Sequence, residues 1–420
     1  MNLGIVALLV LIIVIVVGFI KKLNVGLLAM AAAIVIGYVS GQFSTKEIVS
    51  GFGTSLFVTL LGVTLLFGII SVNGCLDVVM KKIINIFGKR VWFIPILIFI
   101  VGWLVAALAG GFAALTFVCA LCIPIARNSG YDPILLMIIG NAGGQSGRYT
   151  QITADGNIVA SILAEQGIEA KLTSFTINLT IGMIILAVIA FIYFKGYRVK
   201  KVETSEIVIK AERLNIKQWI ALAGIIAMIF CVVVLKKDAG LVSVVIAIVL
   251  ILMKVVDQKE AFQTIPWNTI IMVTGMGMLM NLVIISGGID ILVDVIAKFT
   301  NPVTAKSVSL LTAGFMSWFS STLGVVVPTL VPTVGGIVDA VGGNITEIGI
   351  LSAMIVGSSC AAFSPASSVG GLILSTATGD PHYSQEINSN KVFVTLFIFS
   401  VGMVVISSLL AMTGIYSFFG

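Results

Sequence analysis

The sequence has one histidine, His382, and charged side chains make up only 10% of its residues. A single histidine excludes a histidine metal site. The chain also lacks a His-Glu-x-x-His motif, a nucleophile–base pair and paired aspartates in facing apolar segments. We therefore expect no enzymatic activity, no transition metal and no organic cofactor. Of the 420 residues 59% are hydrophobic and the mean hydropathy is +1.18, which indicates a polytopic membrane protein without a soluble domain.

Only five cysteines are present, and they are scattered, mostly within apolar segments. Cys119 and Cys122 have the spacing of a redox or zinc pair, but no second pair accompanies them. Small buried core residues are the better interpretation.

Apolar runs of membrane-spanning length, about 20 residues, follow one another along the chain. The predicted spans are residues 3–20, 24–41, 54–73, 133–163, 174–197, 217–235, 239–254, 267–289, 345–378 and 390–418. Two further apolar blocks, 92–126 and 305–340, are each interrupted near the middle by small or polar residues. Such a block predicts a re-entrant helical hairpin with its tip buried in protein.

Positive charge sets the predicted orientation. With the N-terminus outside, 17 of the 24 Lys and Arg residues fall on the inner side, and Arg148 alone lies within the membrane. The six on the outer side are Lys46, Lys171, Lys236, Lys237, Lys298 and Lys306. The net charge of +6 is thus an orientation signal, and we expect no nucleic-acid partner. Both termini are predicted outside the cell membrane and the basic loop 195–217 in the cytoplasm.

The two halves of the chain resemble each other at an offset of about 215 residues. Gly62 matches Gly277 and Trp103 matches Trp318, and the order of spans, hairpin and polar-interrupted span is kept. Each half has an odd number of crossings, five, which inverts the second copy as in secondary transporters. The predicted fold class is an all-α polytopic membrane protein. It consists of two inverted repeats of five transmembrane helices, each with a re-entrant hairpin and a broken helix.

Residues 75–90 fit neither a span nor a loop. Asp77, Lys81 and Asn85 fall at i, i+4 and i+8, and apolar residues cover the other face. This pattern predicts a helix lying along the inner membrane interface. An ordinary cytoplasmic connector is the alternative.

The span 133–163 is longer than a crossing needs, and polar residues fill its middle. Unwinding is expected around its glycines, which are poor helix formers: Gly143, Gly144, Gly147 and Gly156. A charge inside a membrane is a functional hypothesis by default. Arg148 can present a planar fork to a carboxylate, and Asp155 can ligate a cation or carry a proton. The alternative is a buried pair that only fixes the break.

Hard oxygen and amide donors surround these charges: Ser146, Thr150, Thr153 and Asn157. They suit Na⁺ or substrate hydrogen bonds, although each can instead bond its own helix backbone.

The second long span, 345–378, repeats the pattern without charge. Its break holds Pro365, Gly370–Gly371 and several serines, among them Ser364, Ser367 and Ser368. At the predicted hairpin tips, Gly110–Gly111 and Thr116 face Ser320, Ser321 and Thr322. Helix ends meeting there offer partial charges to a ligand. The alternative is two ordinary kinked helix pairs, since Pro328 and Pro332 alone would kink a helix.

This layout resembles the ion transporter superfamily, in particular the divalent anion:sodium symporters. The stretch Leu23 to Gly37, "LNVGLLAMAAAIVIG", together with the whole-chain plan, resembles the malonate/dicarboxylate carrier branch. In the symporters each hairpin tip carries Ser-Asn-Thr, and each broken span carries Thr-Pro-Pro-Asn or similar. Here the second tip has Ser321 in the asparagine place, the first tip keeps only Thr116, and the first broken span keeps Thr153 and Asn157 without the prolines.

The resemblance implies cation-coupled symport of a small carboxylate, a dicarboxylate such as malonate, by a homodimer with an elevator mechanism. The expected substrate-binding residues are Arg148, Ser146, Thr150, Thr116, Ser321, Thr322 and Ser364. The expected cation-binding residues are Gly110, Gly111, Thr153, Asp155, Asn157, Ser320, Ser367 and Ser368. The departures from the family motifs leave Na⁺ and H⁺ both open as the cation.

The implied division follows the repeats. Residues 1–90 form the scaffold part of repeat 1, and 91–200 form its transport part, with hairpin 92–126 and broken helix 133–163. Residues 201–304 form the cytoplasmic linker and the scaffold part of repeat 2. Residues 305–420 form the second transport part, with hairpin 305–340 and broken helix 345–378.

Two other functions remain open. One is a cation/proton antiporter with Asp155 as the proton carrier, and the other is a membrane-complex subunit that transports nothing. An inert scaffold has no need of two symmetry-related polar breaks.

Overall fold

The computed structural model describes residues 3–21, 23–52, 54–75, 78, 91–109, 111–199, 213–235, 237–265, 267–318, 321–365, 367–379 and 389–417. Within these ranges every regular element is helical. The predicted all-α class is therefore confirmed.

The first half contains α1 (Leu3–Lys21), α2 (Val25–Ser40), α3 (Thr45–Ser50), α4 (Thr54–Asn73), η1 (Val91–Phe93), α6 (Ile94–Ala109), α7 (Gly111–Ser129), α8 (Pro133–Gly147), α9 (Ala154–Glu165), α10 (Leu172–Tyr193) and η2 (Gly196–Arg198). The second half contains α11 (Ile216–Val233), α12 (Ala239–Leu252), α13 (Gln258–Gln263), α14 (Trp267–Ile285), α15 (Gly288–Lys298), α16 (Ala305–Trp318), η3 (Thr322–Val326), α17 (Val327–Leu330), η4 (Val331–Thr333), α18 (Val334–Val341), α19 (Glu347–Ala361), α20 (Ser368–Gly379), α22 (Ser389–Ala411) and η5 (Ile415–Ser417).

The internal repeat is visible in the order and spacing of the helices. α12 begins 214 residues after α2, and α19 and α20 begin 214 residues after α8 and α9. Each predicted hairpin becomes two helical arms, α6 with α7 and α16 with the segment from η3 to α18. Each predicted broken span becomes two helices, α8 with α9 and α19 with α20.

Several helices suit a bilayer by length and composition. Among the described residues four helical stretches are long and apolar enough to cross it: Val91–Leu108, Leu172–Tyr193, Thr322–Val341 and Lys391–Ala411. Shorter apolar helices include α2, α12 and α19. The chain is a multi-pass membrane protein, and its orientation stays a prediction.

α15 is an amphipathic helix, and most of it lies between the predicted span 267–289 and the predicted hairpin 305–340. It meets α14 at an angle of 82°, and Asp290, Asp294 and Lys298 are exposed along one face. Its place in the second repeat corresponds to that of residues 75–90 in the first. Of that predicted interface helix, 76–77 and 79–90 lie outside the described residues, so its prediction is not decided.

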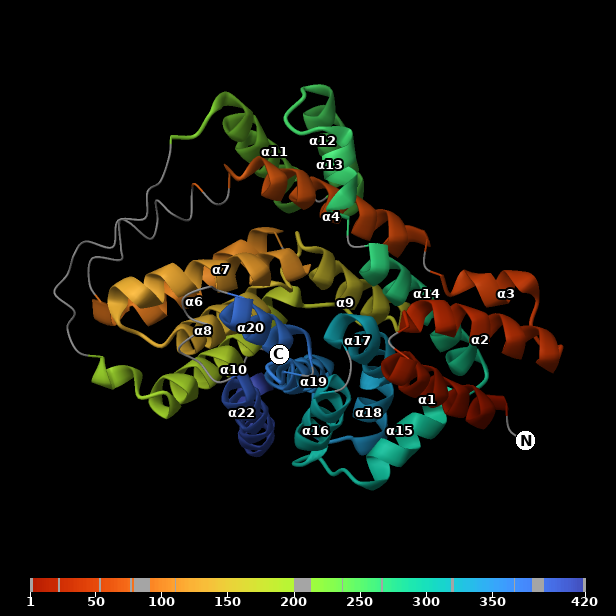
Figure 1. Ribbon diagram of the computed structural model, residues 1–420. Coiled ribbons are helices and arrows are strands. Elements are labelled where there is room, and N and C mark those ends of the chain that lie inside the picture. The colour runs from red at the N-terminus through yellow and green to blue at the C-terminus, as the bar shows by residue number, and fades with distance from the viewer. Residues whose placement is uncertain are drawn as a thin grey trace.

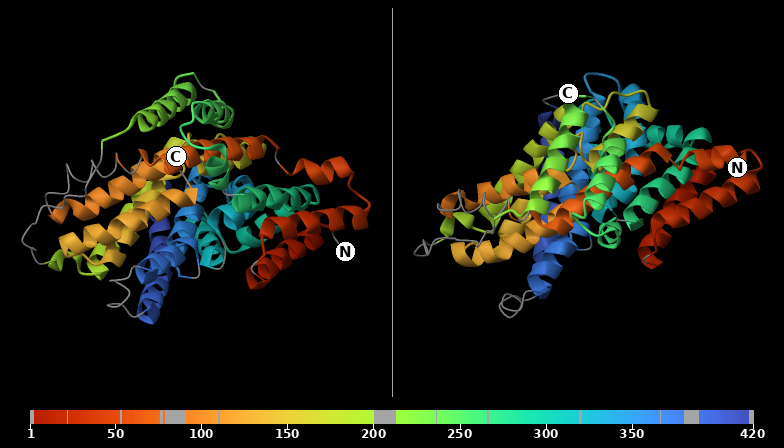
Figure 2. Two further views of the ribbon diagram at one scale, coloured as in Figure 1. Left: turned by 45° about the horizontal axis from the view of Figure 1, so that its top comes forward. Right: turned by 90° about the horizontal axis from the view of Figure 1, so that it is seen from above.

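The helices form a central group and two arms (Figure 1). The centre holds α6 to α10 and α16 to α22, where α6 packs on α8 and α16 packs on α19. One arm holds α4 with α11, α12 and α13, and the other holds α1, α2 and α3 with α14 and α15. α1 and α2 stay at one end of the molecule in both views of Figure 2.

Each arm combines helices from both repeats. α2 packs on α14 and α12 packs on α4, and both contacts are made at glycine. A Cβ at Gly26 would lie 2.4 Å from Ile271 O, and a Cβ at the equivalent Gly240 would lie 2.3 Å from Thr59 Cα. The backbones approach this closely only because small residues line the interface, as is common between membrane helices. The predicted division into scaffold and transport parts concerns movement and stays a prediction.

Candidate functional site

The first helix break runs from residue 148 to residue 153, between α8 and α9. Thr153 caps α9: its Oγ1 accepts from Gly156 N at 3.2 Å. The same hydroxyl lies 2.6 Å from Arg148 O and 2.8 Å from Thr150 O, and these two carbonyls share its single proton. One side chain therefore serves the start of α9 and the carbonyl of Arg148, the C-cap of α8.

The glycines expected to unwind this span do not do so. Gly143, Gly144 and Gly147 are helical residues of α8, and Gly156 lies in the first turn of α9. A Cβ at Gly143 would lie 2.1 Å from Phe99 O on α6. Gly143 and Gly147 allow α8 to pack closely on α6, and Gly144 contacts Leu115 on α7. This tertiary requirement outweighs their low helix propensity.

Arg148 and Asp155 face each other across the break. Arg148 Nε donates to Asp155 Oδ2 in a salt bridge, and the residues are 6% and 4% exposed. Arg148 Nη1 also donates to Gln145 Oε1 at 2.8 Å, and the guanidinium carbon lies 5.8 Å from the centre of the Tyr149 ring. The two charges cancel, so the guanidinium of Arg148 is buried in a site without net charge.

Tyr149 anchors the break to α10. Its carbonyl accepts from Thr176 Oγ1 at 3.1 Å, and its ring packs edge-on against Phe175 with centroids 5.4 Å apart. Its hydroxyl is buried and has no hydrogen-bond partner within the residue ranges given above.

The remaining predicted residues of this break mostly bond backbone. Ser146 is buried, and its hydroxyl donates to Gly143 O at 2.8 Å within α8. Thr150 Oγ1 donates to Ala107 O on α6 at 3.1 Å. Asn157 Nδ2 donates to Thr153 O at 2.7 Å. These contacts place them at the break, and their roles toward substrate or cation stay predictions.

The first hairpin tip is only partly described. Gly110 lies outside the described residues, and Gly111 is the first residue of α7. Thr116 lies further along α7 and is exposed.

The second tip is better defined. Ser320 lies outside the described residues, whereas Ser321 caps η3 by accepting from Gly324 N at 3.3 Å. Thr322 is buried, with its hydroxyl 3.2 Å from Ser317 Oγ. The arm that follows changes helix type near Pro328 and Pro332, because proline removes a backbone donor.

The second break, residues 362–367, contains no charge. Ser364 and Ser367 are buried, and Ser368 is the exposed first residue of α20. Backbone bonds close the turn: Gly370 N donates to Ala362 O at 2.9 Å and Ser367 N to Ser364 O at 2.8 Å. The two breaks are thus alike in position and different in chemistry.

The second half of each broken helix contacts the hairpin of the other repeat. α20 packs on α7 and α8, and α9 packs on η4. At the end of α9, Gln166 Nε2 donates to Val331 O at 3.0 Å and its Oε1 accepts from Gly335 N at 3.3 Å. The structure therefore assembles both breaks and both hairpins in one central group.

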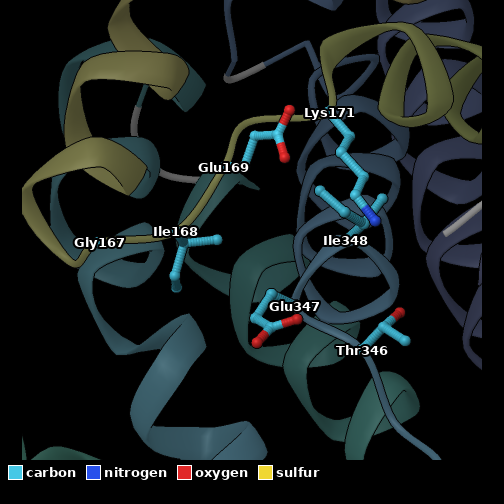
Figure 3. A pocket seen from close by; sticks show the side chains of 7 residues that line it. All are labelled: Gly167, Ile168, Glu169, Lys171, Thr346, Glu347 and Ile348. Atoms are coloured by element: carbon cyan, nitrogen blue, oxygen red, sulfur yellow. The ribbon is translucent and has the colours of Figure 1, made fainter.

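A cavity of about 290 Å³ lies at the far end of α9 (Figure 3). It is lined by Gly167, Ile168, Glu169 and Lys171, and by Thr346, Glu347 and Ile348 at the start of α19. α9 has 12 residues, so about 18 Å of helix separates this cavity from the Arg148 break. The cavity lies between two loops, is lined by charges of both signs, and is far from the buried ion pair of Arg148 and Asp155. It is therefore separate from the site at the first break.

Gln145 is not among the predicted site residues, and it lies beside Arg148. The signal was present in the spacing, since residues 141, 145 and 148 fall at i, i+4 and i+7 on one helix face. The cysteine interpretation is confirmed: Cys119 and Cys122 are free and buried.

The chain resembles known transporters in sequence and in fold. Residues 1–148 match the family described as the dicarboxylate carrier protein MatC N-terminus. Among curated proteins, none matches the chain. The fold is similar to that of the YdaH transporter of Alcanivorax borkumensis, with 12% identity and a TM-score of 0.57, covering 88% of this chain and 87% of that one. It is also similar to MtrF of Neisseria gonorrhoeae, one of a class of antimetabolite efflux pumps, with 12% identity and a TM-score of 0.60, covering 87% and 83%.

The resemblance to the dicarboxylate carrier branch is thus confirmed over residues 1–148. Together with the similar folds, this match describes an all-helical, multi-pass membrane protein that is similar to known transporters.

Proposed function

We propose that the chain is a secondary active transporter that carries a small carboxylate, a dicarboxylate such as malonate, together with a cation, Na⁺ in preference to H⁺. The observation that carries this proposal is Arg148, a buried guanidinium at a helix break, directly at the end of the segment that matches a dicarboxylate carrier. Arginine binds carboxylates in a planar, two-pronged geometry.

Charge balance favours a co-transported cation. A dicarboxylate brings two negative charges to a site where Arg148 and Asp155 already cancel. Burying uncompensated charge within a membrane costs several kcal/mol. A cation held by the oxygens of the break, among them those of Asp155, Thr153 and Asn157, would lower that cost. Substrate and cation would then each improve the binding of the other.

Burial of the site favours an elevator-type movement. Arg148 and Asp155 are at most 6% exposed, so a solute reaches them only when surrounding helices move. The central helices that carry both breaks make contacts with one another across the two repeats, which suits displacement as one unit against the arms.

The direct test is uptake into proteoliposomes of a radiolabelled carboxylate panel, with an inward Na⁺ gradient, a proton gradient or neither. We expect dicarboxylate uptake that rises steeply with Na⁺, and its abolition in Arg148→Ala although the protein still inserts. Undiminished uptake by Arg148→Ala contradicts the site. Cation–proton exchange without any organic substrate, lost in Asp155→Asn, would favour the antiporter instead.

A homodimer belongs to the same proposal. α2 leaves Val35, Tyr38 and Val39 60%, 63% and 83% exposed along one face, which suits lipid or a second copy of the chain. Light scattering coupled to size-exclusion chromatography in mild detergent measures the mass, and a value for one chain would contradict the dimer.

A further inference from the structure

Gln145 is buried in α8, one turn before the break, and it is 1% exposed. Its side-chain nitrogen, Nε2, has no hydrogen-bond partner among the residues that the structure describes. Its Oε1 accepts from Arg148 Nη1 at 2.8 Å. Because arginine can only donate, the oxygen of the amide must face Arg148 and the NH₂ group must face away from it.

Asn141 repeats this feature one turn earlier. Its Nδ2 donates to Met137 O at 2.8 Å and to Cys119 Sγ at 3.1 Å, while Oδ1 is buried without a hydrogen-bond partner in the described part of the chain. Asn141, Gln145 and Arg148 share the face of α8 that lies away from the glycines packed on α6. A polar face with unmet hydrogen-bonding atoms therefore runs along a buried helix up to the ion pair.

Such atoms carry a cost. A buried donor without an acceptor destabilises a protein, because it has lost its hydrogen bonds to water and gained none in return. Arg148 lies beside Gln145 and carries five N–H donors, of which Nε bonds Asp155 and Nη1 bonds Gln145. A planar anion with two oxygens suits this pair, since one oxygen can accept from the amide and the other from the guanidinium.

We propose that Gln145 Nε2 and Arg148 together bind one carboxylate of the substrate, with Gln145 as a specificity-determining residue. This inference rests on the proposed function. Gln145 supplies a neutral donor, so it favours an acceptor without adding charge to the site. Asp155 holds the Nε edge of Arg148, and the substrate approaches from the side of the Gln145 amide.

The test is equilibrium binding of radiolabelled malonate and succinate to the purified, full-length protein in lipid nanodiscs with Na⁺. Gln145→Met removes the donor at similar volume, and Gln145→Glu replaces it with an acceptor. The control is Gln151→Glu, the same chemical change at an exposed position of the break. Its backbone carbonyl, which lies near Asn157 Nδ2, is kept.

We expect about 10- to 100-fold weaker binding by Gln145→Met, the size of one hydrogen bond to a charged group. Gln145→Glu should bind at least as weakly at pH 8, and its affinity relative to the unsubstituted protein should recover as the pH falls, because a protonated carboxyl regains a donor. Gln151→Glu should bind normally. A merely structural role for Gln145 would give no such recovery.

Unchanged affinity in Gln145→Met would overturn the inference, and so would a deficit of Gln145→Glu that does not depend on pH. If Gln145→Glu fails to insert, Gln145→Met decides. Failure of the unsubstituted protein to bind any dicarboxylate would instead overturn the proposed function itself.

Discussion

Trp103 on α6 donates its indole N–H to Thr180 Oγ1 on α10 at 3.3 Å. Thr180 in turn donates to Thr176 O at 2.7 Å, and Thr176 Oγ1 donates to Tyr149 O in the first break. A chain of hydrogen bonds thus joins the first hairpin to the helix break through α10.

The second repeat keeps the same plan with different residues. Trp318 Nε1 donates to Ser400 Oγ at 3.0 Å, and Ser400 Oγ lies 3.2 Å from Cys360 O at the end of α19. In both repeats the last helix, α10 or α22, is hydrogen-bonded to the first hairpin arm and to backbone at or directly before the break.

Trp103→Phe should lower the free energy of unfolding by about 0.5–1.5 kcal/mol, because it removes one partly buried donor and leaves Thr180 without it. Trp318→Phe should have a similar effect. Denaturant unfolding in mild detergent measures both. Trp219→Phe is the control, since Trp219 is 61% exposed on α11. A loss as large in Trp219→Phe as in the other two would contradict the structural role of the chain.

Gly143→Ala should destabilise the central group, because the new methyl would meet the backbone oxygen of Phe99, which cannot turn aside. We expect a loss of more than about 1 kcal/mol, typical of overpacking. Gly402→Ala is the matched control: a Cβ there has no neighbour within 4 Å. It should leave the unfolding temperature unchanged or raise it slightly, since alanine is the better helix former. Equal effects of the two substitutions would count against close packing of α6 on α8.

Arg148→Met should lower stability by about 3–5 kcal/mol, because it leaves the Asp155 carboxylate buried without its partner. The double variant Arg148→Met with Asp155→Leu should recover part of that loss, since no isolated charge remains. A double-mutant cycle on purified protein measures the coupling. Additive losses would mean that the two side chains do not stabilise each other.

Thr153→Ala should speed hydrogen exchange at the first amides of α9 and cost about 1 kcal/mol, the usual effect of losing an N-cap. Thr153→Ser keeps the hydroxyl and should exchange like the unsubstituted protein. Mass spectrometry of peptides covering 150–160 reports the rates. Hydrogen exchange as slow in Thr153→Ala as in the unsubstituted protein would show that contacts other than this cap stabilise the start of α9.

The order of the elements could be predicted from the sequence because it depends on local composition. The length of the apolar runs predicted the spans. Small or polar residues that interrupt these runs predicted the hairpins and the two broken helices. The repeat offset was visible in pairs such as Trp103 and Trp318, which the structure places in equivalent hydrogen bonds.

The position of the first break could not be predicted in the same way. Low helix propensity pointed to Gly143, Gly144 and Gly147, but the contact with α6 that keeps them helical involves residues about 40 positions away. The break begins instead at Arg148, whose ion pair and cap contacts replace helical bonds. Gln145 could not be predicted for a related reason: whether its amide nitrogen has a partner depends on side chains from other helices.

α2 packs on α14 and α4 packs on α12, so each arm pairs a helix of the first repeat with one of the second. This pairing has a consequence for biosynthesis. When the ribosome has made only the first repeat, the surfaces around Gly26 and Thr59 have no protein to cover them, and lipid must occupy their place. Neither arm can reach its final form until the second repeat has been inserted. The two halves therefore complete their folding together, and a chain truncated after the first repeat forms neither arm.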